Sequence, residues 1–82
     1  MRLPVCLPGG ATGWTRDVST TGVFVEVDRP EAVGTDLQFS MRFENLDLRG
    51  PIELRCEGTI VRVEGRPGAG GMAVALRSYG GS

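Results

Sequence analysis

Histidine and lysine are both absent from this chain of 82 residues. Without histidine there is no imidazole ligand for a metal, no Cys–His nucleophile pair and no serine triad. The ten carboxylates fall mostly singly along the sequence, so no pair of them requires an acid–base role. The composition therefore disfavours an enzyme, with catalysis by carboxylates alone as the alternative, and it calls for no metal or organic cofactor.

An excess of charge of either sign is also missing, since nine cations and ten acidic residues leave a net charge of −1. A protein that holds nucleic acid through its phosphates usually carries a strongly basic face, so neither DNA nor RNA is an expected partner. Every cation is an arginine. The guanidinium group suits contacts with phosphate and guanine, but genomic base composition is the simpler explanation of this preference.

Long apolar runs are absent as well. No stretch approaches the roughly 18 apolar residues that a membrane helix needs, and the first residues lack the apolar segment of a secretory signal. We therefore expect a cytoplasmic protein without membrane insertion.

Cys6 and Cys56 each stand among apolar neighbours, which favours two small buried side chains in a reducing compartment over a disulfide.

Short segments with alternating apolar residues, separated by clusters of glycine, proline and polar residues, fill the chain. They predict strands at residues 3–7, 11–18, 23–27, 36–44, 52–63 and 72–76, loops at 45–51 and 65–71, and a flexible tail at 79–82. Helical periodicity is not found. At this length we expect a single domain over residues 1–82, and a closed barrel hides its strand edges better than an open sheet. The predicted fold is all-β, a small six-stranded antiparallel β-barrel.

Strand alternation also predicts which side chains form the core. The set that shares the inward phase is Leu37, Phe39, Met41, Phe43, Val61, Val63, Met72, Val74 and Leu76. Within residues 52–63 the apolar positions change from even to odd past Gly58, and one register cannot bury both halves, so we expect a β-bulge at residues 57–58. Trp14, the only tryptophan, is expected in the core or at the mouth of the barrel, with an exposed partner-binding position as the alternative.

Residues 17–22 (DVSTTG) form a polar turn immediately before an apolar strand. Asp17 and Ser19 have side-chain oxygens that suit hydrogen bonds with nearby backbone N–H groups, and Gly22 tolerates a positive φ. Such a turn holds polar side chains still at a strand entrance, where a ligand can reach them. An ordinary hairpin corner has the same residues at the same spacing, so both interpretations stay open.

In sequence order, several segments together resemble the PilZ domain, a six-stranded β-barrel that serves bacteria as a receptor for cyclic di-GMP. They are DVSTTG at 17–22, GVFVEV at 22–27, the spacer ending AVGT at 32–35, CEGTIVRV at 56–63 and GMAVAL at 71–76. Ala73, Ala75 and Leu76 depart from the family's closing strand. The resemblance implies a signalling module with cyclic di-GMP as its candidate ligand.

The family's nucleotide site has two elements, a [D/N]xSxxG box and an RxxxR segment immediately before the first strand. By this resemblance Asp17 accepts hydrogen bonds from guanine N–H groups, Ser19 orders the turn and Gly22 lets the ligand approach closely. Arg2 stands where the last arginine of RxxxR would fall, but the first arginine has no counterpart.

Two further arginines need an interpretation. Arg16, next to the box, is a candidate replacement for the missing charge, with a solvated strand position as the alternative. Arg62 and Arg66 have the RxxxR spacing but follow much later in the chain, and we interpret them as strand surface and loop. We expect Arg2, Arg16, Asp17 and Ser19 to meet at one groove beside the first strand, because consecutive elements usually lie side by side.

The incomplete arginine pair predicts that this chain binds cyclic di-GMP weakly or not at all. Two explanations stay open: the chain begins inside the motif of a longer protein with further domains, or it is a degenerate domain that acts as a protein-interaction adaptor. An oligonucleotide-binding barrel that stacks bases on aromatic side chains is a third hypothesis. The inward phase of Phe39 and Phe43 and the acidic charge balance disfavour it.

Overall fold

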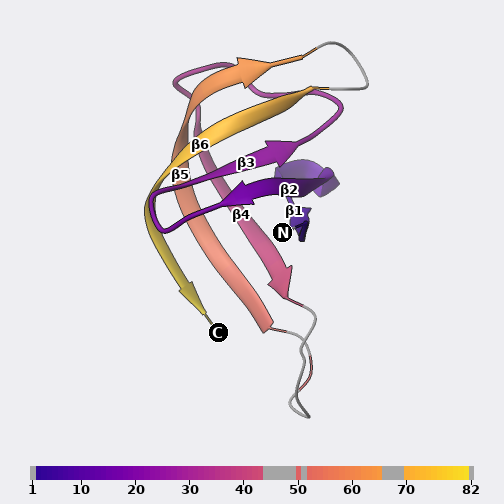
Figure 1. Cartoon of the computed structure of the whole chain (residues 1–82), viewed down its shortest axis with the longest axis vertical. Helices are drawn as coiled ribbons and strands as arrows, with labels where there is room; N and C mark the ends of the chain where they lie inside the picture. Colours follow the sequence, from indigo (N-terminus) through magenta and orange to yellow (C-terminus); the bar gives the residue numbers. More distant parts are fainter. Residues whose placement is uncertain (1, 44–49, 51, 66–69, 82) are drawn as a thin grey trace.

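Six antiparallel strands close into a barrel in the computed structural model of the chain (Figure 1). The structure describes residues 2–43, 50, 52–65 and 70–81. The strands are β1 (Pro4–Cys6), β2 (Thr12–Val18), β3 (Gly22–Glu26), β4 (Asp36–Phe43), β5 (Ile52–Glu64) and β6 (Gly71–Gly81). The predicted all-β barrel is confirmed, and the one short 3-10 turn of the described residues, η1 (Pro8–Gly10), joins β1 to β2.

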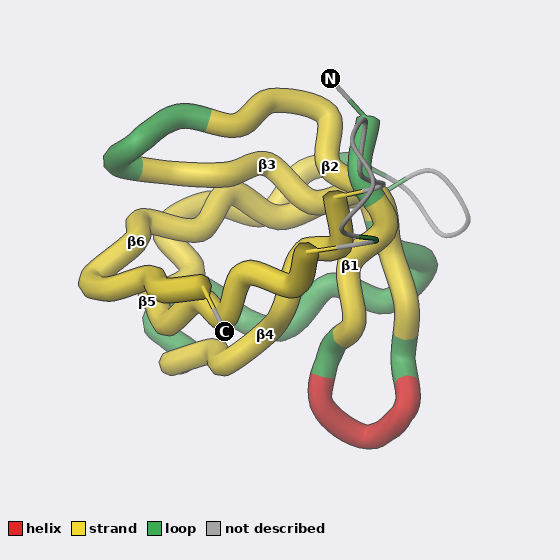
Figure 2. The backbone as a smooth tube through the Cα atoms, turned by 90° about the horizontal axis from the view of Figure 1, so that it is seen from below, coloured by secondary structure: helices red, strands yellow, loops and turns green. Residues whose placement is uncertain are grey.

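The order of the strands around the barrel is β1-β2-β3-β6-β5-β4, and β4 pairs back with β1 (Figure 2). This order departs from the sequence order at two pairs of neighbours: the last strand, β6, lies between β3 and β5, and β4 lies beside β1. The hairpin of β2 and β3 is thereby brought beside the C-terminal half of the chain. In the described residues, no helix is long and apolar enough to cross a membrane.

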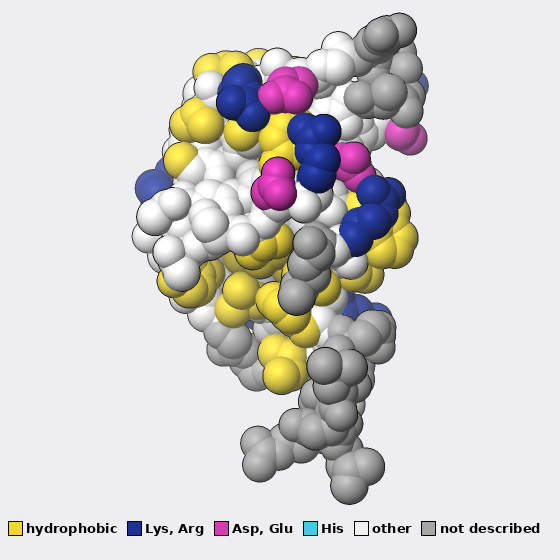
Figure 3. Space-filling model, viewed as in Figure 1, with side chains coloured by type: hydrophobic (Ala, Val, Ile, Leu, Met, Phe, Trp, Pro, Cys, Tyr) yellow, Lys and Arg dark blue, Asp and Glu magenta, His cyan; other side chains and the backbone are white. Residues whose placement is uncertain are grey.

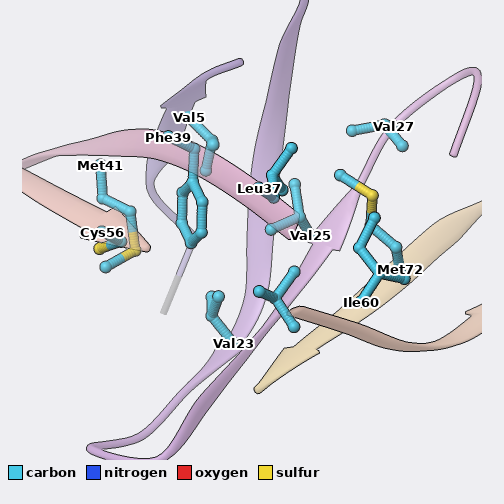
Figure 4. Close-up of a cluster of buried hydrophobic side chains, with 11 residues drawn as sticks. Val5, Val23, Val25, Val27, Leu37, Phe39, Met41, Cys56, Ile60 and Met72 are labelled. Carbon is cyan, nitrogen blue, oxygen red and sulfur yellow. The ribbon is translucent and has the colours of Figure 1, made fainter. Parts of the chain in front are cut away.

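The barrel is filled by apolar side chains from β1, β3, β4, β5 and β6 (Figure 4), whereas β2 contributes the buried polar Thr15. The buried cluster comprises Val5, Val23, Val25, Val27, Leu37, Phe39, Met41, Cys56, Ile60, Met72 and Val74. Alternation puts them there because successive residues of a strand face opposite sides of the sheet. The prediction is confirmed for Leu37, Phe39, Met41, Met72 and Val74, whereas Phe43 and Leu76 are only partly buried against the cluster.

The predicted register irregularity of β5 exists, but its geometry is different. Opposite residues 57–58 the extra residue belongs to β6, because Glu57 pairs with Ser78 and Gly58 with Leu76, which leaves Arg77 between them. The extra residue of β5 is Val61, between the pairs that Ile60 and Arg62 make with β6.

At the Val61 bulge the inward-facing positions of β5 change from even to odd residue numbers. The sequence pattern required such a change, but the bulge lies three residues later than expected. Cys56, Gly58 and Ile60 face inward at even positions, and beyond the bulge Val63 pairs with the buried Met72. Core positions for Val61 and Val63 are nevertheless wrong, since Val61 is 55% exposed and Val63 is 41% exposed. Val61 is the extra residue itself, and Val63 lies where β5 is about to end.

Gly58 marks a close approach of two strands rather than a bulge in its own strand. A Cβ at this position would lie 2.5 Å from the carbonyl oxygen of Ala75 on β6. Opposite it, the extra residue Arg77 donates hydrogen bonds to Asp36 Oδ1 at 2.7 Å and to Thr59 Oγ1 at 2.9 Å. The hydrogen bond from Arg77, followed by the one that Thr59 Oγ1 donates to Asp36 Oδ1 at 2.9 Å, lowers the pKa of Asp36 below its ordinary value. Arg77 therefore connects the β6 bulge to Asp36 on β4 and to Thr59 on β5 through hydrogen bonds.

Three further expectations need correction. Residues 79–81 continue β6, with Tyr79 paired to Cys56, so the predicted tail is strand as far as Gly81. Trp14 lies on the outer face of β2 and is 46% exposed, because its inward neighbours Gly13 and Thr15 take the core positions. Cys6 is exposed on β1 whereas Cys56 is buried.

Two predicted loops lie largely outside the described residues. They are the loop at 45–51, apart from Gly50, and residues 66–69 of the next loop.

Truncation of a core ring tests this register. Phe39→Ala removes a side chain that is 5% exposed and should lower the free energy of unfolding by about 3–5 kcal/mol. Val61→Ala, at a bulged outward position, should change it by less than about 0.5 kcal/mol. Urea denaturation followed by circular dichroism measures both. A larger loss for Val61→Ala than for Phe39→Ala would contradict the register.

The two cysteines should react differently with a thiol reagent. Burial raises the pKa of the Cys56 thiol, which lowers its thiolate fraction, and the same burial blocks access of the reagent. Iodoacetamide at pH 8 should therefore alkylate Cys6 in the folded protein and leave Cys56 until the protein is denatured, as read by peptide mass spectrometry. Equal labelling of both thiols under native conditions would place Cys56 outside the core.

Candidate functional site

The turn between β2 and β3 is held together by Ser19. Its backbone N–H donates to the Gly22 carbonyl at 2.9 Å, and its hydroxyl oxygen accepts from the N–H groups of Gly22 at 3.1 Å and Thr21 at 3.3 Å. One side chain thus satisfies two backbone donors that the tight turn leaves unpaired. The result is a fixed corner at the end of the hairpin.

Gly22 opens β3, and its role differs from the one expected. It is not among the described glycines with positive φ. A Cβ at Gly22 would lie 3.1 Å from the Val74 carbonyl oxygen of β6, closer than nearly all real Cβ contacts. The glycine therefore permits β3 and β6 to approach each other directly behind the turn.

Asp17 presents a free carboxylate at this corner. It pairs with Phe24 in the ladder between β2 and β3, and its side chain is exposed. Asp17 has no hydrogen-bond or ion-pair partner within the part of the chain that the structure describes. Both carboxylate oxygens are available to accept hydrogen bonds from a ligand.

Arg16 is the extra residue of a β-bulge in β2. Thr15 pairs with Val25 and Asp17 pairs with Phe24, so Arg16 has no partner of its own in the ladder. Bulges re-aim side chains. Here the guanidinium carbon lies 3.9 Å from the centroid of the Phe24 ring, a cation–π geometry, and Nη2 lies 3.4 Å from Glu64 Oε1.

Arg16, Asp17, Ser19 and Gly22 line one surface cavity of about 400 Å³. Its floor includes the Phe24 ring and the backbone of β6, and its far wall carries Arg62. Arg62 was not expected at the site, because it lies far from residues 17–22 along the chain. Only the insertion of β6 between β3 and β5 brings Arg62 to the box, and no local sequence pattern signals that insertion.

Arg2 does not join this cavity, although its backbone is nearby. The Thr15 N–H donates to the Leu3 carbonyl at 2.9 Å, which places Arg2 one residue beyond this β1–β2 contact. The guanidinium of Arg2 lies 5.4 Å from the Trp14 ring and forms an ion pair with Glu26. Arg2 lines a separate cavity of about 440 Å³ with Trp14 and Glu26, so the expected meeting of Arg2 with the other candidates is not found.

Every arginine beside these two cavities is already paired with a carboxylate. Arg2 contacts Glu26, Arg16 contacts Glu64, and Arg62 Nη2 lies 2.7 Å from Glu64 Oε2. Figure 3 shows positive and negative side chains interspersed over the upper part of the face that it presents. The box therefore faces a locally balanced charge rather than a positive field. No group of three potential metal ligands occurs in the described ranges.

The structure is thus a closed barrel with a fixed polar corner and a cavity on its outer face. The PilZ domain model matches residues 2–79, nearly the whole chain, and the chain belongs to the PilZ domain family. Cyclic di-GMP reception is the general role of this family, and the match agrees with the box at residues 17–22. No curated protein and no solved structure matches the chain significantly.

Two substitutions separate the exposed aspartate of the turn from its structural serine. Asp17→Ala removes no hydrogen bond to the described residues and should change the free energy of unfolding by less than about 0.5 kcal/mol. Ser19→Ala removes the acceptor of two backbone hydrogen bonds, worth about 0.5–1.5 kcal/mol each. Urea denaturation of both variants measures the difference. A larger loss for Asp17→Ala would make Asp17 a structural turn residue.

Proposed function

We propose that this chain is a PilZ receptor module for cyclic di-GMP that supplies the box half of the nucleotide site and binds weakly or not at all by itself. The observation that carries the proposal is the unpartnered Asp17 carboxylate at the rim of a cavity of about 400 Å³. A buried or ion-paired aspartate would suit a purely structural corner. A free one, on a turn fixed by Ser19, suits recognition.

In this proposal Asp17 accepts from N–H groups on the Watson–Crick edge of a guanine. Ser19 keeps the corner rigid, so little conformational entropy is lost when the ligand binds. Arg16, whose guanidinium lies over the Phe24 ring, is available to stack on a base of the ligand. The module binds and signals, and we propose that it performs no catalysis and works in the cytoplasm.

Weak affinity follows from the charge balance. Cyclic di-GMP carries two negative charges and needs fixed positive charge, which Arg16 and Arg62 supply only after releasing Glu64. Arg2, in the position of the last arginine of RxxxR, is engaged by Glu26 and lies along a different cavity. Exposed ion pairs are individually weak, about 0–1 kcal/mol, yet their carboxylates remain in place to repel a phosphate.

A protein-interaction adaptor is the second candidate function. It is favoured by the outer surface around Trp14, whose indole is 46% exposed and stacked with Arg2. Tryptophan and arginine are the side chains most enriched at the centres of protein interfaces. A protein partner or a neighbouring domain would then occupy the cavity that Arg2, Trp14 and Glu26 line.

Calorimetric titration with cyclic di-GMP tests the proposed function. The chain as it stands should bind with a Kd well above 1 μM, so that the binding free energy is weaker than about −8 kcal/mol. Adding Arg-Ala-Ala before Met1 creates the RxxxR spacing with Arg2, and this extension should lower Kd at least tenfold. An Ala-Ala-Ala extension is the matched control, and Asp17→Ala in the arginine-extended protein should abolish the gain.

Two outcomes would contradict the proposal. Micromolar or tighter binding by the unextended chain would show that its own arginines suffice. Failure of the arginine extension to bind at millimolar ligand would show that the box is not half of a nucleotide site, and the adaptor function would remain.

A further inference from the structure

The Glu64 carboxylate lies between two arginines from strands that are not neighbours. Its Oε1 is 3.4 Å from Arg16 Nη2 on β2, and its Oε2 is 2.7 Å from Arg62 Nη2 on β5. Each oxygen thus faces a different guanidinium. Both arginines line the same cavity as Asp17 and Ser19.

The ladder explains how side chains from β2 and β5 meet. Asp17 pairs with Phe24, Phe24 with Ala73, and Ala73 with Arg62, so one row crosses β2, β3, β6 and β5 from the box to Arg62. Three strand spacings of about 4.8 Å separate the ends of this row, roughly 14 Å. A ligand of dinucleotide size spans that distance.

The floor between the two ends is low and flat. Strand β6 contributes Gly71, Ala73 and Ala75 to its outer face, and the Phe24 ring covers Gly71 so closely that a Cβ there would overlap the ring. No large side chain of β6 therefore stands between Arg16 and Arg62. The Arg16 guanidinium lies over Phe24 and extends toward β5, where Glu64 meets it.

A phosphodiester group resembles the carboxylate that now occupies this position. Both present two oxygens and a single negative charge, and the guanidinium fork binds either group through paired N–H donors. The two arginines therefore form an anion site that is filled from within the molecule by Glu64.

We infer that Arg16 and Arg62 are a phosphate subsite of the dinucleotide site, and that Glu64 is its internal competitor. The inference rests on the proposed function, since it assigns the ligand's phosphate to a place beside the box. The subsite takes its positive charge from Arg16 on β2 and Arg62 on β5. Neither of these arginines belongs to the family's RxxxR segment. Binding requires Glu64 to leave both arginines, so Glu64 sets the affinity.

The test is calorimetric titration of the folded chain with cyclic di-GMP, and with cyclic di-AMP as a probe of equal charge. Glu64→Gln should lower Kd for cyclic di-GMP at least tenfold relative to the parent. Glu31→Gln, at an exposed position outside the cavity, removes the same charge and should change Kd by less than twofold. Glu64→Gln combined with Arg62→Gln should return the affinity to that of the parent.

The outcomes separate the subsite from the proposed function. Equal affinities of Glu64→Gln and Glu31→Gln would overturn the subsite, and any binding that Asp17→Ala then abolishes would leave the proposed function standing. Tighter binding of both dinucleotides by Glu64→Gln, lost with Arg62→Gln but unchanged by Asp17→Ala, would support the subsite and contradict guanine recognition by the box. No binding of either probe by Glu64→Gln would overturn the subsite alone, because the proposed function is contradicted only when the arginine-extended protein also fails to bind. Circular dichroism melting confirms that each variant is folded.

Discussion

The insertion of β6 between β3 and β5 is the constraint on which the rest of the structure depends. It closes the barrel, and it brings the β2–β3 hairpin beside the C-terminal half of the chain. The insertion requires close backbone contact on both sides. Gly22 approaches the Val74 carbonyl on one side, and Gly58 approaches the Ala75 carbonyl on the other. A side chain at Gly58 would force β5 and β6 to shift, and one at Gly22 would require β3 and β6 to move by a few tenths of an ångström.

Bulges then decide where the charged side chains of this surface point. Each of the extra residues, Arg16 in β2, Val61 in β5 and Arg77 in β6, stands at an interruption of an otherwise regular ladder. Arg16 is turned onto Phe24, and Arg62 follows directly after the Val61 bulge into the same cavity. Arg77 instead joins Asp36 and Thr59 on another part of the barrel. The distribution of positive charge over the outer face thus depends on irregularities of the sheet as much as on composition.

Much of the fold follows from local pattern. Strict alternation in residues 36–43 predicted the buried Leu37, Phe39 and Met41, and the change of apolar phase in β5 correctly required an irregularity. The position of that irregularity was not predictable from β5 alone, because a bulge depends on how the partner strand, β6, pairs with it. Trp14 shows the same limit. Its exposure depends on which neighbours face inward, and hydrophobicity alone favoured burial.

The box was readable from residues 17–22 alone, because the residues of a turn and the hydrogen bonds that Ser19 accepts from the N–H groups of Thr21 and Gly22 are local. Tertiary structure alone decided what surrounds the box. It placed Arg62 and Glu64 beside Arg16 through a strand order that no short segment encodes, and it directed Arg2 toward Trp14 and Glu26. The physical reason is that electrostatic contacts depend on distance in space, and in a barrel that distance is set by closure between strands remote in sequence.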